Sequence, residues 1–269
     1  MNKDLKKMRS KKSFIILGIV FVLYLLVVFV FIPLGNKDKE NEYITYLIVG
    51  SNVKWQYEDG KWDVMKDTAK KIGFNRYECY TNQQYLGNYS LSFYQGKWYL
   101  FDRNNDSVDY EGILFAYYSK SNMKVYQDEV EPIDNEGQAY LTDYLEENGI
   151  SLHNYANLNV NKMYHTDVDG DGEKEKLYVA SNFRNSDIKD KAFSIIFYEN
   201  NGKIQVVKER FESKEASMIL PYYDIIALFD FKDDGKYEFI VEDVPFSRGE
   251  PKFTLYQLEG KKYIPIMQD

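Results

Sequence analysis

The sequence has 269 residues, a formal net charge of −8, and 44% hydrophobic and 17% aromatic residues. This aromatic content excludes a disordered chain, and the 25 Tyr and 17 Phe favour β-strands. The acidic charge argues against a nucleic-acid-binding protein, because phosphate contacts require clustered basic residues. Cys79 is the only cysteine, so an intrachain disulfide is excluded as well.

The N-terminal region has the pattern of a membrane anchor. Among residues 1–12 six are basic and one is acidic, and residues 13–35 contain no charged residue. The apolar run at 14–32 would span roughly 28 Å as a helix, close to the thickness of about 30 Å of a bilayer's hydrocarbon core. Pro33 and Gly35 would end this helix. We therefore predict a cytoplasmic tail at residues 1–12 and a transmembrane helix at residues 13–35.

The charge distribution also predicts the orientation of the chain. Basic residues precede the apolar run, whereas Lys37 and Lys39 after it alternate with acidic residues, so the N-terminus should stay in the cytoplasm. The predicted localisation is the cell membrane, single-pass, with an extracellular C-terminal domain. Without the tail, 28 of the 34 basic and 41 of the 42 acidic residues remain, a net charge near −13. The richness in Lys, Asn, Ile, Tyr and Phe is typical of a bacterial protein from an AT-rich genome.

Two alternatives to this membrane anchor remain open. A cleaved signal peptide would have a shorter apolar region, of about 7–15 residues, and a small-residue cleavage site, which residues 29–35 lack. A buried helix of a soluble protein is the second alternative.

Beyond a short linker at residues 36–42, the chain repeatedly shows an aromatic run, a turn ending in Gly-Lys and another such run. This arrangement predicts β-hairpins. The hairpins are expected at residues 55–62, 91–100, 193–207 and 253–264. Further strands are expected at residues 43–49, 76–80, 112–118, 177–180, 225–229 and 239–242.

One helix is predicted near the middle of the chain. Asp134 or Asn135 can cap its N-terminus, Gly149 can end it, and the apolar residues between them share one face. The predicted fold class is therefore mainly β, with an N-terminal transmembrane helix, an antiparallel β ectodomain of hairpins and one mid-chain helix. We place the linker and helix at 128–150, between an N-terminal β module at 43–127 and a C-terminal β module at 151–269.

Residues 167–175 carry carboxylates at alternating positions, which is typical of a calcium-binding loop. A calcium ion takes about six to eight oxygen ligands, and a glycine at the sixth position permits the sharp turn. An EF-hand would require a glutamate at the twelfth position, where Tyr178 stands, and helical flanks in place of the predicted strand. We therefore predict a calcium site between two strands. Its candidate ligands are Asp167, Asp169, Asp171, Glu173 and Glu175.

At this loop the chain resembles the FG-GAP or VCBS-like repeats of integrin-type β-propellers, whose blades carry an acidic calcium loop between strands. A second copy at residues 230–238 begins 63 residues after the first, about the length of one blade. The resemblance covers roughly residues 160–269 and implies a β-propeller-like arrangement with calcium as the cofactor. The chain departs from the family in three ways. Two copies cannot close a propeller, the Phe-Gly dipeptide is missing, and Lys232 replaces an acid in the second copy.

Lys232 stands where the second copy would offer its second carboxylate. A cation at the place of a ligand oxygen predicts that this loop has lost its metal and kept its turn. For both loops the alternative is an Asp-Gly-rich turn whose carboxylates cap backbone amides without any ion.

Features of an enzyme are weak in this sequence. The only histidines are His153 and His165, and the common metalloprotease, serine-hydrolase and dinucleotide-binding motifs are missing. His165 is expected on a strand. Two acidic pairs could serve a glycosidase, Asp109 with Glu111 and Asp128 with Glu129, although pairs of this kind arise by chance in so acidic a chain.

The sequence thus predicts a membrane-anchored cell-surface protein with a non-enzymatic, calcium-binding β module for interaction with a protein or glycan ligand. The alternative is a carboxylate-based hydrolase acting on envelope polymers. A deep cleft with two carboxylates about 5 to 10 Å apart would favour the hydrolase. A structural or sensory role is a further alternative.

The predicted topology can be checked with protease added to intact cells. Because the acidic domain is expected outside the membrane, the protease should digest the bulk of the chain, as measured by immunoblotting of a cytoplasmic N-terminal tag. Full protection of the domain would contradict this topology. N-terminal sequencing that began near Asn36 would instead indicate a cleaved signal peptide.

Overall fold

The computed structural model describes most of the chain from residue 45 onward. The described residues are 45–49, 52–58, 61–64, 76–82, 84–94, 97–110, 112–117, 123–126, 129–151, 158–189, 191–232, 234–247 and 249–269. They all belong to one compact unit, Ile44–Asp269. The predicted tail and transmembrane helix at residues 1–35 lie outside them. No helix within the described part of the chain is both long and apolar enough to cross a membrane.

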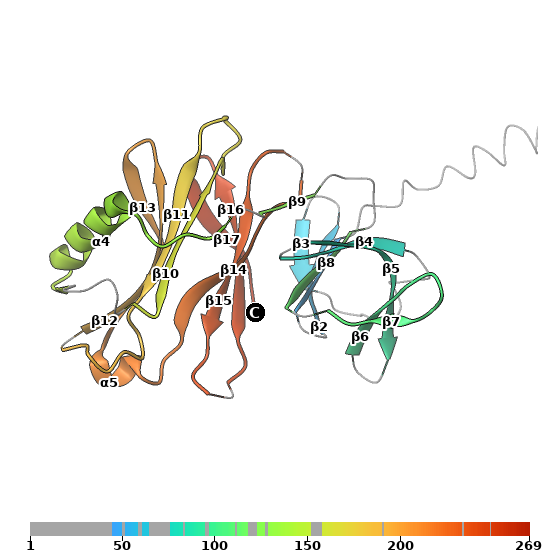
Figure 1. The fold of residues 1–269 in the computed structure, drawn as a ribbon, viewed down its shortest axis with the longest axis horizontal. Coiled ribbons are helices and arrows are strands. Elements are labelled where there is room, and N and C mark those ends of the chain that lie inside the picture. The colour runs from blue at the N-terminus through green and yellow to red at the C-terminus, as the bar shows by residue number, and fades with distance from the viewer. Residues whose placement is uncertain are drawn as a thin grey trace, which may run out of the picture. The chain divides into compact units, whose positions relative to one another are not determined.

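The described residues form three antiparallel sheets and two helices (Figure 1). The fold is therefore mainly β, as predicted. The N-terminal sheet contains β1 (Thr45–Val49), β2 (Asn52–Glu58), β3 (Lys61–Val64), β4 (Arg76–Thr81), β5 (Tyr85–Tyr94), β6 (Lys97–Phe101), β7 (Ser107–Val108) and β8 (Ile113–Tyr117). Its strand order is β3-β2-β1-β8-β4-β5-β6-β7.

Each of the two C-terminal sheets contains a four-stranded meander, in which strands that follow one another in the chain pair side by side. The four-stranded sheet has the order β10-β11-β12-β13, with β10 (Val160–Thr166), β11 (Glu175–Ser181), β12 (Lys191–Asn200) and β13 (Lys203–Ser213). The five-stranded sheet has the order β17-β16-β15-β14-β9, with β14 (Tyr222–Asp230), β15 (Glu238–Val244), β16 (Lys252–Glu259), β17 (Lys262–Gln268) and β9 (Lys124–Val125). The meanders are β10–β13 and β14–β17, and β9 adds to the five-stranded sheet beside β14. The four predicted hairpins correspond to β2–β3, β5–β6, β12–β13 and β16–β17.

The predicted mid-chain helix is confirmed as α4 (Asn135–Glu147), and its two ends follow from the sequence. The Asp134 side chain accepts a hydrogen bond from the Gly137 N–H, as an N-cap residue does. At the other end Gly149 has φ +72°, a left-handed conformation that costs glycine little. The Ile150 N–H then donates to the Leu145 carbonyl at 2.8 Å and closes the last turn. A second, four-residue helix, α5 (Lys214–Ser217), follows β13.

The inner strands β11 and β12 of the four-stranded sheet are buried on both faces. Alternate side chains of a strand point to opposite sides, so each strand contributes to two cores. On one face, Tyr178 and Phe197 pack against Leu141 and other residues of α4. On the other face, Leu177 and Ile196 pack against residues of the five-stranded sheet. This burial explains why β11 and β12 read as nearly continuous apolar runs instead of alternating ones.

The five-stranded sheet is also buried on both faces. One face contributes Tyr223 and Phe239 to the core shared with the four-stranded sheet. The other face contributes Phe229 and Leu255 to a second core, which contains Phe115 and other residues of the N-terminal sheet. The Phe115 and Phe229 rings lie 4.3 Å apart between their centroids. The five-stranded sheet is therefore the central layer of the described unit.

The N-terminal sheet curls around a core of its own. Buried residues from β1, β4, β5, β6 and β8 form one cluster, which includes Tyr46 and Cys79. Strands β2 and β6 approach each other although four strands separate them in the sheet order, which a flat sheet would not allow. Cys79 is completely buried and forms no disulfide.

Replacing Gly137 with alanine tests the contact between α4 and the four-stranded sheet. Alanine usually stabilises a helix relative to glycine, by up to about 1 kcal/mol. Here an added Cβ would lie 2.8 Å from Ile133 Cγ2 and closer still to the ring of Tyr178, which is fully buried and cannot yield. Gly137→Ala should therefore lower the free energy of unfolding by about 1–3 kcal/mol in urea denaturation. The exposed Asp143→Ala serves as the control, and a stabilised Gly137→Ala protein would contradict this packing.

Candidate metal centre

The predicted calcium loop, residues 167–175 and hereafter the first loop, connects β10 to β11. Thr166 and Glu175 are the last paired residues of these strands, so the loop joins two antiparallel strands as predicted. The Asp167 carboxylate accepts hydrogen bonds from the Gly170 N–H at 2.8 Å and from the Gly172 N–H at 2.9 Å. These bonds fold the loop back over its first residue.

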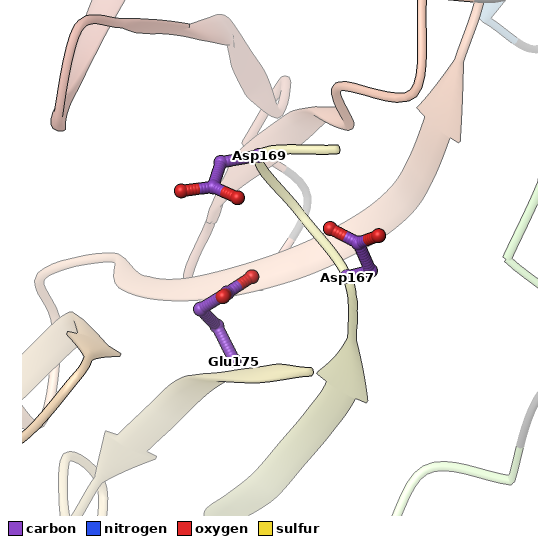
Figure 2. Close-up of side chains that lie close together, drawn as sticks. All are labelled: Asp167, Asp169 and Glu175. Atoms are coloured by element: carbon purple, nitrogen blue, oxygen red, sulfur yellow. The ribbon is translucent and has the colours of Figure 1, made fainter. Parts of the chain in front are cut away.

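Three of the five candidate ligands come together in this loop. Asp167, Asp169 and Glu175 each offer a carboxylate oxygen, and these oxygens lie within 4.8 Å of one another. Figure 2 shows the three carboxylates around a common space, two from the loop and one from the start of β11. Oxygens bound to one calcium ion at about 2.4 Å are separated by no more than about 4.8 Å, so the three can share one ion. We call them the acidic triad.

The other two candidate ligands, Asp171 and Glu173, are not part of this group. Both are exposed, and the Asp171 carboxylate accepts a hydrogen bond from the Glu173 N–H at 2.8 Å. The alternating spacing correctly indicated a convergent loop. It could not indicate which carboxylates face inward, because this depends on the turn that the bonds to Asp167 create.

Glu175 supplies the buried charge of the triad. It is 3% exposed, and one of its oxygens accepts a hydrogen bond from the Val168 N–H at 2.9 Å. Burial raises the pKa of Glu175 to about 7, the Val168 N–H opposes this rise, and the charges of Asp169 and its acidic neighbours add to it. The ionised triad is therefore unfavourable unless a cation or a proton compensates its charge.

Asn200, at the end of β12, also contacts the triad. Its side-chain amide donates to Asp169 at 3.1 Å and to the Tyr198 hydroxyl at 2.9 Å, and the residue is 5% exposed. Nothing in the local sequence indicates this contact, because Asn200 precedes Asn201 and Gly202 and has the pattern of a hairpin turn. β12 pairs with β11 in the sheet and so brings Asn200 to the first loop.

The second loop, residues 230–238, connects β14 to β15 and repeats the main contacts of the first. The Asp230 carboxylate accepts from the Gly235 N–H at 2.9 Å, as Asp167 accepts from Gly172. Glu238 accepts from the Phe231 N–H at 3.4 Å, as Glu175 accepts from Val168. The two meanders thus carry equivalent loops at the same place in their topology.

The two loops also touch each other. A Cβ atom added to Gly170 would lie 3.2 Å from the Gly235 carbonyl carbon, closer than most side chains approach a backbone. The Tyr237 N–H of the second loop donates to the Val168 carbonyl of the first at 3.0 Å. Glycine at both positions permits this close approach, which the spacing of the two loops in the sequence did not reveal.

The structure gives little support to the other candidate residues. His165 lies on β10, as expected, and is exposed. His153, Glu111 and Asp128 lie outside the described residues. A cavity of about 440 Å³ opens between β10 and β14, and Asp224 is the one carboxylate among the described residues that line it. Asp224 forms an ion pair with Lys162 at 2.7 Å, so this cavity does not present the two carboxylates of a glycosidase.

A scan against protein-family models finds no match to this chain, and searches of curated proteins and of solved structures find none either.

The buried charge of Glu175 predicts a specific dependence of stability on pH. The pKa of Glu175 in the folded chain lies above the ordinary value of 4.5. The contribution of this carboxyl to the free energy of unfolding is therefore fully present below about pH 4.5 and is lost as the pH rises through about 7. Glu175→Gln keeps an oxygen for the Val168 N–H but carries no charge. In metal-free buffer it should be more stable than the unsubstituted chain by up to about 3 kcal/mol at about pH 8, and equally stable at about pH 4.

Urea denaturation across this pH range measures the difference. The exposed Glu173→Gln removes the same charge from the same loop and should follow the unsubstituted chain at every pH. Equal pH profiles for Glu175→Gln and the unsubstituted chain would show that the Glu175 charge is not buried in solution.

Proposed function

We propose that this protein is a membrane-anchored cell-surface protein whose β ectodomain binds calcium in the first loop and presents a surface to a protein or glycan partner. The observation that carries the calcium proposal is the acidic triad, with three carboxylate oxygens within 4.8 Å and Glu175 buried among them. The anchor is proposed from the uncharged run at residues 13–35 and its basic flank.

The chemistry of the triad supports calcium over softer or smaller ions. All three candidate ligands are carboxylates, which suit hard cations, and neither histidine nor cysteine takes part. The exposed rim at residues 170–174 leaves room for water and backbone oxygens to complete a shell of about six to eight ligands. Magnesium requires a tighter octahedral shell and loses its water reluctantly, so it fits this flexible loop less well.

The resemblance to FG-GAP or VCBS-like repeats is part of the same proposal. Its support is the repeated arrangement, in which each C-terminal meander carries an acidic loop between its first and second strands. The outward surface of such a domain would contact the partner, and the anchor would hold that surface at the membrane.

Calcium should raise the melting temperature of the full chain in detergent. An ion at ten times its dissociation constant stabilises a protein by about 1.4 kcal/mol, which corresponds to about 3–5 °C for a domain of this size. Extracellular calcium modules bind at about 0.1–1 mM, so the shift should appear in the millimolar range and disappear with a chelator. Magnesium should produce a smaller shift. Differential scanning fluorimetry measures all of these effects.

Two matched substitutions separate the triad from the general acidity of the loop. Asp169→Asn and Glu173→Gln each remove one negative charge, but only Asp169 belongs to the triad. Asp169→Asn should abolish most of the rise in melting temperature that calcium produces. Glu173→Gln should retain this rise within about 1 °C. If the unsubstituted chain showed no shift, the first loop would be a turn and the calcium proposal would fail.

A further inference from the structure

The second loop has a carboxylate at two of the three positions that form the acidic triad in the first loop. Asp230 stands at the position of Asp167, and Glu238 stands at the position of Glu175. Both are more deeply buried than their counterparts, since Asp230 is completely buried and Glu238 is 1% exposed. Burial raises the pKa of Glu238 to about 8, although the Lys232 ammonium opposes this rise, so the ionised form of Glu238 is unfavourable here without a cation beside it.

Lys232 stands at the remaining position of the triad, where the first loop has Asp169. Its ammonium nitrogen lies 3.7 Å from a carboxylate oxygen of Glu238 and 5.1 Å from the centre of the Phe231 ring. The side chain is 26% exposed, so it reaches inward from the loop to a fully buried carboxylate. An ammonium between a carboxylate and an aromatic face is favoured by both neighbours.

Asp230 of the second loop has a cation beside it, since Lys124 Nζ of β9 lies 3.8 Å from its carboxylate. We propose that the Lys232 ammonium is the resident cation at Glu238, and that it takes there the place that calcium takes at Glu175 in the first loop. The comparison with calcium rests on the proposed function, whereas the position of the ammonium beside Glu238 involves no metal. Lys232 therefore replaces both a ligand and the ion that this ligand would bind, and the second loop keeps its shape at every calcium concentration.

The surroundings of the two loops explain why one would carry its own cation. Phe231 of the second loop packs against Tyr57 at 4.6 Å and Trp62 at 5.1 Å, so this loop helps to hold the N-terminal sheet on the five-stranded sheet. Residues 170–174 of the first loop are instead exposed. A cation that could dissociate from the second loop would loosen the packing between the two sheets, whereas a covalently attached ammonium does not dissociate.

The first test removes the tethered cation without adding a carboxylate. In metal-free buffer, Lys232→Gln should lower the melting temperature of the full chain by about 2–4 °C, and Lys232→Arg, which restores a cation, should stay within about 1 °C of the unsubstituted chain. Lys236→Gln is the matched control, because Lys236 is an exposed lysine of the same loop. If Lys232→Gln were as stable as the unsubstituted chain, the proposal would be wrong.

The second test restores the acidic triad in the second loop. Lys232→Asp should bind two calcium ions where the unsubstituted chain binds one, as measured by equilibrium dialysis with radioactive calcium, and calcium should recover the stability that this variant loses. Lys236→Asp makes the same change in charge and should still bind one ion. Uptake of one ion by Lys232→Asp would overturn the proposal and leave the proposed function intact.

The two proposals can fail separately. If the unsubstituted chain binds no calcium, the proposed function fails. The comparison of Lys232→Gln with Lys232→Arg then still decides the role of Lys232, because it involves no metal.

Discussion

The structure depends on the burial of a glutamate at the start of the second strand in each C-terminal meander. Glu175 and Glu238 are both nearly inaccessible to solvent, and each accepts a hydrogen bond from the backbone at the beginning of its loop. This bond ties the two ends of the loop together and sets where the strand pair opens. Burying a charge is costly unless it is compensated, so each buried glutamate must either bind a proton or have a cation close to it.

The layered core places a second constraint on the chain. The inner strands of the four-stranded and five-stranded sheets, such as β11, β12 and β15, are buried on both faces, so most of their residues are apolar. The buried glutamates Glu175 and Glu238 stand at the ends of such strands, where the loops emerge. The contact between Gly170 and Gly235 joins the two loops at one end of the packed sheets. The acidic triad thus lies where the loops of the two packed sheets touch, although the rim of its loop is exposed.

Local patterns in the sequence predicted the elements of the fold well. The Gly-Lys turns correctly indicated four hairpins, and Asp134 and Gly149 marked the ends of α4, because these signals depend on neighbouring residues alone. The short strands β7 and β9 were not predicted, and β10 was expected only as a strand at His165 before the first loop, without bounds. β9 has two residues, and β10 contains Asn161, Lys162 and His165, which hide the apolar pattern of its buried positions.

The candidate site was predicted in part for the same reason. The loop and three of its carboxylates follow from a local motif, and the structure brings those three together. The contact with Asn200 and the contact between the loops depend on which strands pair and how the sheets pack. Such relations between distant segments leave no mark on the local sequence, so a single sequence cannot reveal them.

The position of β9 imposes an order on the assembly of the chain. Every other strand pairing in the two C-terminal sheets joins neighbours in sequence, whereas the described part of β9 pairs with β14 across the entire four-stranded meander. Hairpins between neighbours close short loops and form early, while a distant pair must wait for the segment between its strands to become compact. Once β9 has paired, it is held by more than its own two residues, because the adjacent Met123 and Tyr126 are buried in the two cores on either side of the five-stranded sheet. The segment that leads from the N-terminal sheet into the C-terminal sheets is therefore expected to dock late and then to fix the N-terminal sheet to a meander that had to form before it.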